Sequence, residues 1–292
     1  MSERAPDGTA YALAGPEDGE RVVLIHGLGL LKEMWAPFVE RLSQADPQSG
    51  EACAGSAGGA PEPRRDGGTK RVAYRVLSYD LFGHGESGLP PATPSLTVYA
   101  NQLAALIDHV GWEAAHIVGF SLGGMINRRF AMDHPGRARS LAIIASPHER
   151  GGEAQALVEQ RAKDSAAGPA ATLDAAIERW FTPGFRAARP DYIEWTRERV
   201  LANDPANFAA CRWVLANGVV ELIRPDPPIA LPTLVMTAEH DSGSTPAMAR
   251  AIASEIPGAA TIVVPHLQHM GLVEDVDAFA APLESFIERN SP

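Results

Sequence analysis

The chain of 292 residues is 45% hydrophobic, which is enough for one large α/β domain with an insertion. It has neither an apolar run of about 18 residues nor the basic, apolar and small-residue order of a signal peptide, so we expect no membrane span and no export. The formal net charge of −11 argues against binding to nucleic acid or to an anionic membrane, although a few local cations could still hold an anionic substrate.

The two cysteines, Cys53 and Cys211, lie far apart in unlike contexts. Neither has the spacing of a metal ligand, and a pair so placed does not suggest a disulfide framework. We therefore expect a reducing, cytoplasmic location, with no metal and no cofactor.

Alternating strands and helices run along most of the chain. Apolar, β-branched runs predict buried strands at 21–27, 71–80, 115–120, 139–145, 232–238 and 260–265. Runs with helical spacing lie at about 33–45, 95–110, 121–134, 245–256 and 274–289. This order predicts a mostly parallel, doubly wound sheet.

Two segments interrupt the alternation. Residues 46–70 are dominated by Gly, Ala, Pro and Ser, so we expect a flexible surface loop with little protection from hydrogen exchange. Residues 150–228 have helical patterns in place of strands, with a helix start at Asp204-Pro205 and a stop at Asn217-Gly218. We expect this second segment to form a helical cap on a core domain made of residues 1–149 and 229–292.

The stretch "VGFSLGGM", residues 118–125, places Ser121 between the end of a strand and the start of a helix. Gly119 and Gly123 are expected where a turn is too crowded for a Cβ atom. The pattern G-x-S-x-G is typical of a nucleophile elbow, which exposes a serine hydroxyl beside a helix N-terminus. The alternative is an ordinary tight turn, because a chain with 27 glycines can contain the pattern by chance.

A serine hydroxyl needs a base to remove its proton, and the base needs an acid to orient it. Asp241 follows the predicted strand 232–238, and His269 follows the predicted strand 260–265. The order Ser121, Asp241, His269 is the order expected of a serine triad on this type of sheet.

Nearby residues offer alternatives to this acid and base. Glu239 or His240 could be the functional residue, with Asp241 serving only to form the turn. His266 could replace His269 as the base, but it follows Pro265 directly and is expected to lie too early to reach the serine.

An oxyanion in the transition state needs preorganised donors. The backbone N–H of Leu122, at the start of the elbow helix, is the first candidate. The second is the N–H of Leu28 in "LIHGLGLLKEMW", residues 24–35, where the chain can turn tightly at His26-Gly27. We expect His26 to brace this loop by hydrogen bonding, the alternative being a catalytic role.

Two more residues are candidates for contact with a substrate. In the first long cap helix, Leu173, Ile177 and Trp180 form one apolar stripe, and Trp180 could line the site or pack the cap against itself. His148 follows the strand 139–145 at the expected catalytic edge, where it could contact the substrate or lie in a surface turn.

Five motifs together resemble those of the α/β-hydrolase superfamily: HGLG followed by a tryptophan, "SYDLFGHGESG", GFSLGG, "EHDSGSTP" and "HMGLVED". The resemblance spans nearly the whole chain. It implies an α/β-hydrolase fold, that is, a mostly parallel doubly wound sheet with the helical cap inserted after the sixth strand. It also implies a structural role for Asp80 and "GHGES", and serine at the elbow argues against a haloalkane-dehalogenase-like reaction.

Residues 178–216 resemble the cap of 3-oxoadipate enol-lactonases and related carboxylesterases. The oxyanion loop departs from that pattern, since enol-lactonases often have an "NSLG"-like sequence where this chain has "HGLG". The resemblance implies a hydrolase of a small carboxylic ester or lactone that acts through an acyl-enzyme. The alternatives are a hydrolase of C–C bonds in ring-cleavage products, a perhydrolase, or a non-catalytic binding protein on the same fold. The sequence does not predict an oligomeric state.

Overall fold

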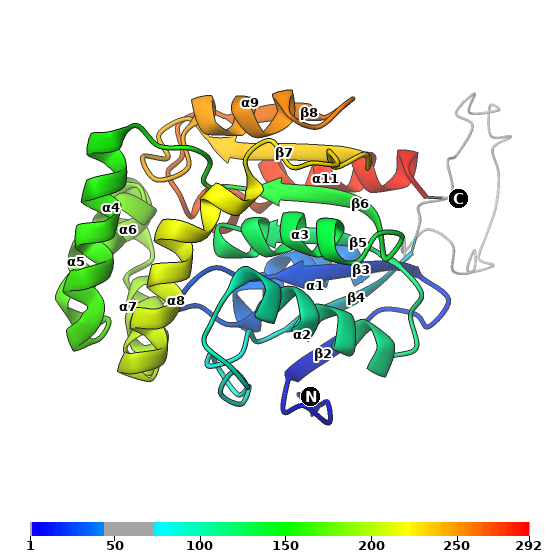
Figure 1. Cartoon of the computed structure of the whole chain (residues 1–292), viewed down its shortest axis with the longest axis horizontal. Helices are drawn as coiled ribbons and strands as arrows, with labels where there is room; N and C mark the ends of the chain where they lie inside the picture. The colour runs from blue at the N-terminus through cyan, green and yellow to red at the C-terminus, as the bar shows by residue number, and fades with distance from the viewer. Residues whose placement is uncertain (1, 44–72, 292) are drawn as a thin grey trace, which may run out of the picture.

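The computed structural model describes residues 2–43 and 73–291, in which eight strands form one sheet (Figure 1). The strand order is β1-β2-β4-β3-β5-β6-β7-β8. Strand β2 pairs antiparallel with β1 and β4, and the other neighbouring strands are parallel. The loop predicted at 46–70 lies outside the described residues.

The strands are β1 Glu3–Arg4, β2 Ala10–Ala14, β3 Glu20–Ile25, β4 Tyr74–Tyr79, β5 Ala115–Phe120, β6 Ala138–Ile144, β7 Thr233–Ala238 and β8 Ala260–Val264. The last six correspond to the predicted strands. Strands β1 and β2 were not predicted, because β1 has only two residues and β2 is rich in alanine, which has low strand propensity. With both included, the cap follows the sixth strand, as predicted.

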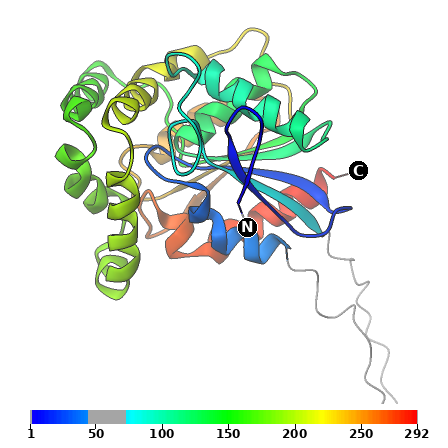
Figure 2. The ribbon, with the colours of Figure 1, turned by 90° about the horizontal axis from the view of Figure 1, so that it is seen from below.

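Helices cover both faces of the sheet. Helices α1 and α11 lie together on one face, and α2 and α3 pack against each other on the opposite face (Figure 2). The helices of the core are α1 Ala36–Ser43, α2 Leu96–His109, α3 Leu122–Asp133, α9 Pro246–Ser254, α10 Gly271–Glu274 and α11 Val276–Arg289, with a short 3-10 helix η1 at Lys32–Trp35. The helix predicted at 274–289 corresponds to α11, which begins two residues later, and Asp275 caps it by accepting from Ala278 N. The short helix α10 before it was not predicted.

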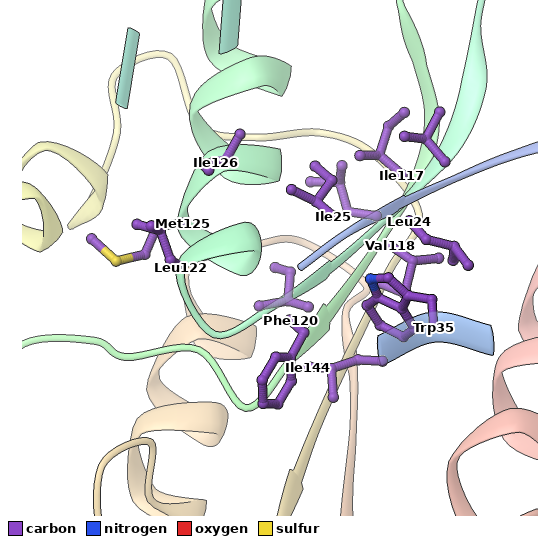
Figure 3. Close-up of a cluster of buried hydrophobic side chains, with 14 of the residues drawn as sticks. Leu24, Ile25, Trp35, Ile117, Val118, Phe120, Leu122, Met125, Ile126 and Ile144 are labelled. Carbon is purple, nitrogen blue, oxygen red and sulfur yellow. The ribbon is translucent and has the colours of Figure 1, made fainter. Parts of the chain in front are cut away.

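The central strands are buried on both sides because helices cover both faces. Every residue of β5 is buried, and Ile117, Val118 and Phe120 belong to the same buried cluster as Leu122 and Met125 of the helix that follows (Figure 3). Strand β5 and the first turn of α3 are thus held by the same core, which fixes the position of the turn between them.

Five helices and two short 3-10 helices lie between β6 and β7 in the chain. They are α4 Gly152–Asp164, η3 Ser165–Ala167, α5 Ala170–Trp180, α6 Pro183–Ala188, α7 Pro190–Leu201, α8 Pro205–Asn217 and η4 Gly218–Leu222. Helices α4 to α8 gather beyond the carboxyl ends of β6 and β7, at the left of Figure 1. Among the described helices, none combines the length and the apolar character needed to cross a membrane.

Candidate active site

Ser121 lies at a sharp turn between β5 and α3. Its backbone has φ 55° and ψ −110°, in a region that non-glycine residues rarely occupy. A Cβ atom at position 119 would lie 2.1 Å from the Gly123 carbonyl oxygen, and one at position 123 would lie 2.4 Å from the Ile25 carbonyl oxygen. Both positions therefore require glycine, and the turn has the strained geometry of a nucleophile elbow.

Asp241 and His269 are joined by a short hydrogen bond. His269 Nδ1 lies 2.7 Å from Asp241 Oδ2, and the Asp241 side chain is fully buried. The other carboxylate oxygen, Oδ1, accepts from Gly243 N at 2.8 Å and Ser244 N at 2.9 Å. The carboxylate is thus fixed on both oxygens, and it can orient the imidazole with Nε2 directed away from Asp241.

Ser121, Asp241 and His269 line one cavity of about 110 Å³ at the carboxyl edge of the sheet. The ring of His269 also packs on Phe120, with 5.0 Å between the ring centroids. None of the described residues makes a hydrogen bond with Ser121 Oγ. Serine–histidine contacts are often long before a substrate binds. The structure therefore brings the three predicted residues together around a space that a substrate can enter.

The two predicted oxyanion donors lie beside the serine. Leu28 lines the cavity together with Gly27, whose Cα is so close to the elbow that an added Cβ would lie 3.3 Å from the Ser121 Cβ. The Leu122 side chain is buried in the core, and its N–H belongs to the first turn of α3, where no intrahelical acceptor exists. Only the Leu122 backbone can therefore serve the site.

His26 braces the oxyanion loop, as predicted. Its Nδ1 lies 2.7 Å from the Gly27 carbonyl oxygen, and its Nε2 accepts from Leu81 N at 2.9 Å. Burial lowers the pKa of His26 to about 4, which keeps the ring neutral and able to accept at Nε2. Its ring does not line the cavity.

Asp80 has the expected structural role. Its carboxylate accepts from Lys32 N at 2.8 Å, Lys32 Nζ at 3.0 Å and Glu86 N at 2.9 Å, which ties the "GHGES" turn to the start of η1. This buried network supports the oxyanion loop and does not line the cavity.

The alternative residues lie away from the cavity. His266 is 88% exposed in its side chain, and its backbone N–H donates to Glu239 Oε2. Glu239, His240 and His266 bring their ligand atoms within 4.8 Å of one another on the surface, so a cation could bind there, but none of the three lines the cavity. The geometry thus favours Asp241 and His269 over these neighbours.

Trp180 closes one side of the cavity, at the end of α5. Its ring centroid lies 6.4 Å from that of His269, and its carbonyl oxygen accepts from Met270 N at 2.8 Å. Glu274 accepts from both Thr182 N and Thr182 Oγ1, so the cap is bound to the histidine loop at two adjacent points. The apolar stripe is divided, since Leu173 and Ile177 are buried whereas Trp180 is partly exposed to the cavity.

His148 is not in a surface turn, and that expectation was wrong. It is 5% exposed, and its Nε2 lies 3.1 Å from Glu255 Oε1. It does not line the cavity either, although its neighbour Pro147 does. Glu255, which directly follows α9, contacts it across 107 positions of the chain, and no local pattern predicts so long-range a contact.

Four arginines that were not predicted as site residues also line the cavity: Arg150, Arg161, Arg179 and Arg212. They come from α4, α5, α8 and the segment before α4. Because they are far apart in the sequence, no local spacing could have revealed them. The sequence indicated only in general terms that a few local cations could hold an anionic substrate in a chain of net charge −11.

Comparison with known proteins places the chain in a family. The model of the alpha/beta hydrolase family matches residues 22–281, so the chain belongs to the α/β-hydrolase family. It is 29% identical to 3-oxoadipate enol-lactonase 2 of Acinetobacter baylyi over 218 residues, which is 74% of this chain and 79% of the relative. It is 24% identical over 259 residues to (E)-2-((N-methylformamido)methylene)succinate hydrolase of the same organism, covering 87% of this chain and 84% of the relative.

The crystal structure of the enol-lactonase from Burkholderia xenovorans superposes with a TM-score of 0.79 and 25% sequence identity, covering 99% of this chain and 100% of that one. The resemblance to α/β-hydrolases and the predicted fold class are thereby confirmed. With relatives of this kind, the chain is a hydrolase.

Proposed function

We propose that the protein is a serine hydrolase that cleaves a small carboxylic ester or lactone through an acyl-enzyme. The observation that carries the proposal is the 2.7 Å contact between His269 Nδ1 and Asp241 Oδ2 in the same cavity as a strained Ser121. A carboxylate, an imidazole and a serine that lines the same cavity provide the orienting acid, the base and the nucleophile of acyl transfer.

In the first half of the reaction, Ser121 Oγ attacks the carbonyl carbon while His269 Nε2 takes the hydroxyl proton. The negative charge moves to the carbonyl oxygen, where the N–H groups of Leu28 and Leu122 stabilise it. His269 then donates the proton to the leaving alkoxide or enolate, and the acyl group remains on Ser121. Asp241 keeps the imidazole in the required tautomer and stabilises its charged form.

In the second half, water enters and His269 removes its proton as it attacks the acyl-enzyme. The same amides stabilise the second oxyanion, and the carboxylic acid leaves as Ser121 recovers its proton from His269. These steps need no metal or cofactor. We further propose that residues 150–228 act as the cap and that Trp180 forms part of the substrate pocket.

The relative named 3-oxoadipate enol-lactonase 2 supports a lactone as substrate, and the relative named for a substituted succinate supports hydrolysis in general. The test is a comparison of p-nitrophenyl esters, aliphatic lactones and a dienoic ring-cleavage product as substrates for the protein and its Ser121→Ala variant. We expect serine-dependent turnover of esters or lactones. Turnover of the ring-cleavage product alone would instead assign a C–C hydrolase, and equal activity of the Ser121→Ala variant would exclude the covalent route.

A further inference from the structure

Three arginines of the cap face the cavity that contains Ser121 and His269. Arg161 belongs to α4, Arg179 to α5 and Arg212 to α8, and α4 packs against both other helices. Three cationic side chains thus converge from three helices on one small space. The chain as a whole carries a net charge of −11, so this concentration of positive charge is local.

None of these three arginines has an ion pair or side-chain hydrogen bond with another residue of the described chain. The one carboxylate that lines the cavity belongs to Asp241, and its oxygens are already occupied by Gly243, Ser244 and His269. Glu178 lies near Arg179 and favours its charged form, but it is exposed and makes no hydrogen bond with it. The positive charge inside the cavity is therefore not balanced by protein groups.

This arrangement costs the folded protein free energy. Burial and the positive charges of Arg179 and Arg161 lower the pKa of Arg212 to about 10. Burial, followed by the charge of Arg161, also lowers the pKa of Arg179. Partly buried cations without counterions do not stabilise a fold, whereas they do stabilise a bound anion. The guanidinium group is also the side chain best suited to planar, two-point recognition of carboxylates.

A fourth arginine differs from these three. Arg150 also lines the cavity, but its guanidinium donates to the Ala216 carbonyl oxygen at 3.2 Å and to Gln155 Oε1 at 3.4 Å. It is therefore held in the wall of the cavity, and the three others remain to receive a ligand. A single carboxylate would leave a net charge of about +2 among the three guanidinium groups, whereas two carboxylates would reduce it to about +1 and offer four acceptor oxygens.

We propose that Arg161, Arg179 and Arg212 form a subsite for two carboxylates, so that the protein takes a dicarboxylate ester or lactone in preference to a neutral one. The choice of substrate rests on the proposed function, but the binding of a dicarboxylate does not. The subsite lies in the cap, and Ser121 lies on the sheet below it. The dicarboxylate group would thus be held while the scissile carbonyl reaches the serine.

Calorimetric titration of the Ser121→Ala variant tests the subsite without any chemistry. Succinate carries two carboxylates, succinamide is its neutral counterpart of similar shape, and butyrate carries one carboxylate. We expect succinate to bind at least about tenfold more tightly than succinamide and more tightly than butyrate, because each charged hydrogen bond contributes about 1.5–3 kcal/mol. Equal affinity for succinate and succinamide would overturn the proposal. Tighter binding of methyl phosphate than of succinate would overturn the assignment to carboxylates.

Arginine variants show whether these residues are responsible. Arg212→Gln and Arg179→Gln should each weaken succinate binding by about 10- to 100-fold. The control is Arg197→Gln, since Arg197 lies on α7, pairs with Asp174 and does not line the cavity. We expect the control to bind succinate as tightly as the parent does. Circular dichroism and thermal melting will show whether each variant is folded. Unchanged succinate affinity in folded Arg212→Gln and Arg179→Gln proteins would overturn the proposal.

Kinetics then connect the subsite to catalysis in the protein with Ser121 intact. The ratio of kcat/KM for the mono-p-nitrophenyl ester of tricarballylic acid, which carries two free carboxylates, to that for p-nitrophenyl butyrate should exceed one. It should fall by about tenfold or more in Arg212→Gln and remain the same in Arg197→Gln. If no ester is hydrolysed but succinate still binds through the arginines, the proposed function fails and the subsite stands. If both esters are hydrolysed with equal kcat/KM in every variant, the subsite fails and the proposed function stands.

Discussion

The sheet side and the cap side of the cavity are built in opposite ways. On the sheet side, backbone groups fix the positions of the reacting side chains. Ser121 lies in a strained turn, and two backbone amides donate to Asp241 Oδ1. The oxyanion loop is held by the buried His26, which accepts from Leu81 N. On the cap side, long side chains from separate helices approach the cavity, and three arginines there lack partners in the described chain. In our proposal, the backbone of the sheet side positions the reacting groups, and side chains of the cap select the substrate.

The largest effect is expected at the sheet side. Ser121→Ala and His269→Ala should each lower kcat by about 10³-fold or more, because each removes a group required for acyl transfer. The double variant should lose no more, since the two residues act as a unit. Asp241→Asn should be slightly milder. The measurement is steady-state hydrolysis of the best ester from the substrate comparison.

A cap variant is the control for this prediction. Arg197→Gln lies on the outer cap and should retain the parent kcat. If Ser121→Ala kept activity within about tenfold of the parent, the sheet side would not supply the chemistry.

Backbone crowding at the elbow should make Gly123→Ala strongly destabilising. The added Cβ would lie 2.4 Å from the Ile25 carbonyl oxygen, and neither backbone segment can move without disturbing the core. We expect a loss of about 3 kcal/mol or more in the free energy of unfolding, measured by urea denaturation. Gly152→Ala in the first turn of α4 is the matched control, because nothing lies within 4 Å of its added Cβ. A Gly123→Ala protein as stable as Gly152→Ala would show that the elbow is not crowded.

The difference between local backbone geometry on the sheet side and long-range side-chain contacts on the cap side also explains what could be predicted from the sequence. The elbow, its serine and the order of acid and base were predictable, because strain at Ser121 requires glycines at fixed offsets and the loops follow recognisable strands. The covering of His148 by Glu255 and the convergence of Arg161, Arg179 and Arg212 depend on how helices pack, and the residues that meet are far apart in the chain. The edge strand β1 and its neighbour β2 could not be predicted, because a two-residue strand and an alanine-rich strand give no alternating pattern.

The sheet side should also carry a pH dependence that the cap does not. Burial lowers the pKa of His26 to about 4 and that of His84 to about 3, below the 6.5 of an exposed histidine. At pH values between the folded pKa and the unfolded pKa of 6.5, the unfolded chain binds protons at these histidines that the folded chain does not. The free energy of unfolding therefore falls as the pH is lowered through this range. We expect acidification from pH 6.5 to 5 to lower the unfolding free energy by about 1.5 kcal/mol for each of these two histidines.

Urea denaturation at several pH values measures this slope. His26→Gln retains an acceptor for Leu81 N but has no titrating ring, so its slope in this window should be shallower than that of the parent. An unfolding free energy that does not change between pH 6.5 and 5 would contradict the neutral, buried state of these rings.

The smallest effect is expected at Trp180, where the two sides of the cavity meet. Because Trp180 lines the cavity and is only partly buried, Trp180→Ala should raise KM severalfold or shift the preferred acyl length while Tm changes little. Ile177→Ala, on the same helix face but buried, should instead lose about 2–5 kcal/mol of stability and keep the substrate profile. A Trp180→Ala protein that melts well below the parent with an unchanged profile would make Trp180 a packing residue only.

The central claim is that Ser121 is an activated nucleophile on the sheet side of the cavity. Mass spectrometry of the intact protein after reaction with a fluorophosphonate tests it most directly, because that reagent phosphonylates activated serines. We predict one adduct per chain, located at Ser121 by peptide mapping and absent from Ser121→Ala and His269→Ala. Folded protein that remained unlabelled, or that carried its adduct on another residue, would contradict the account.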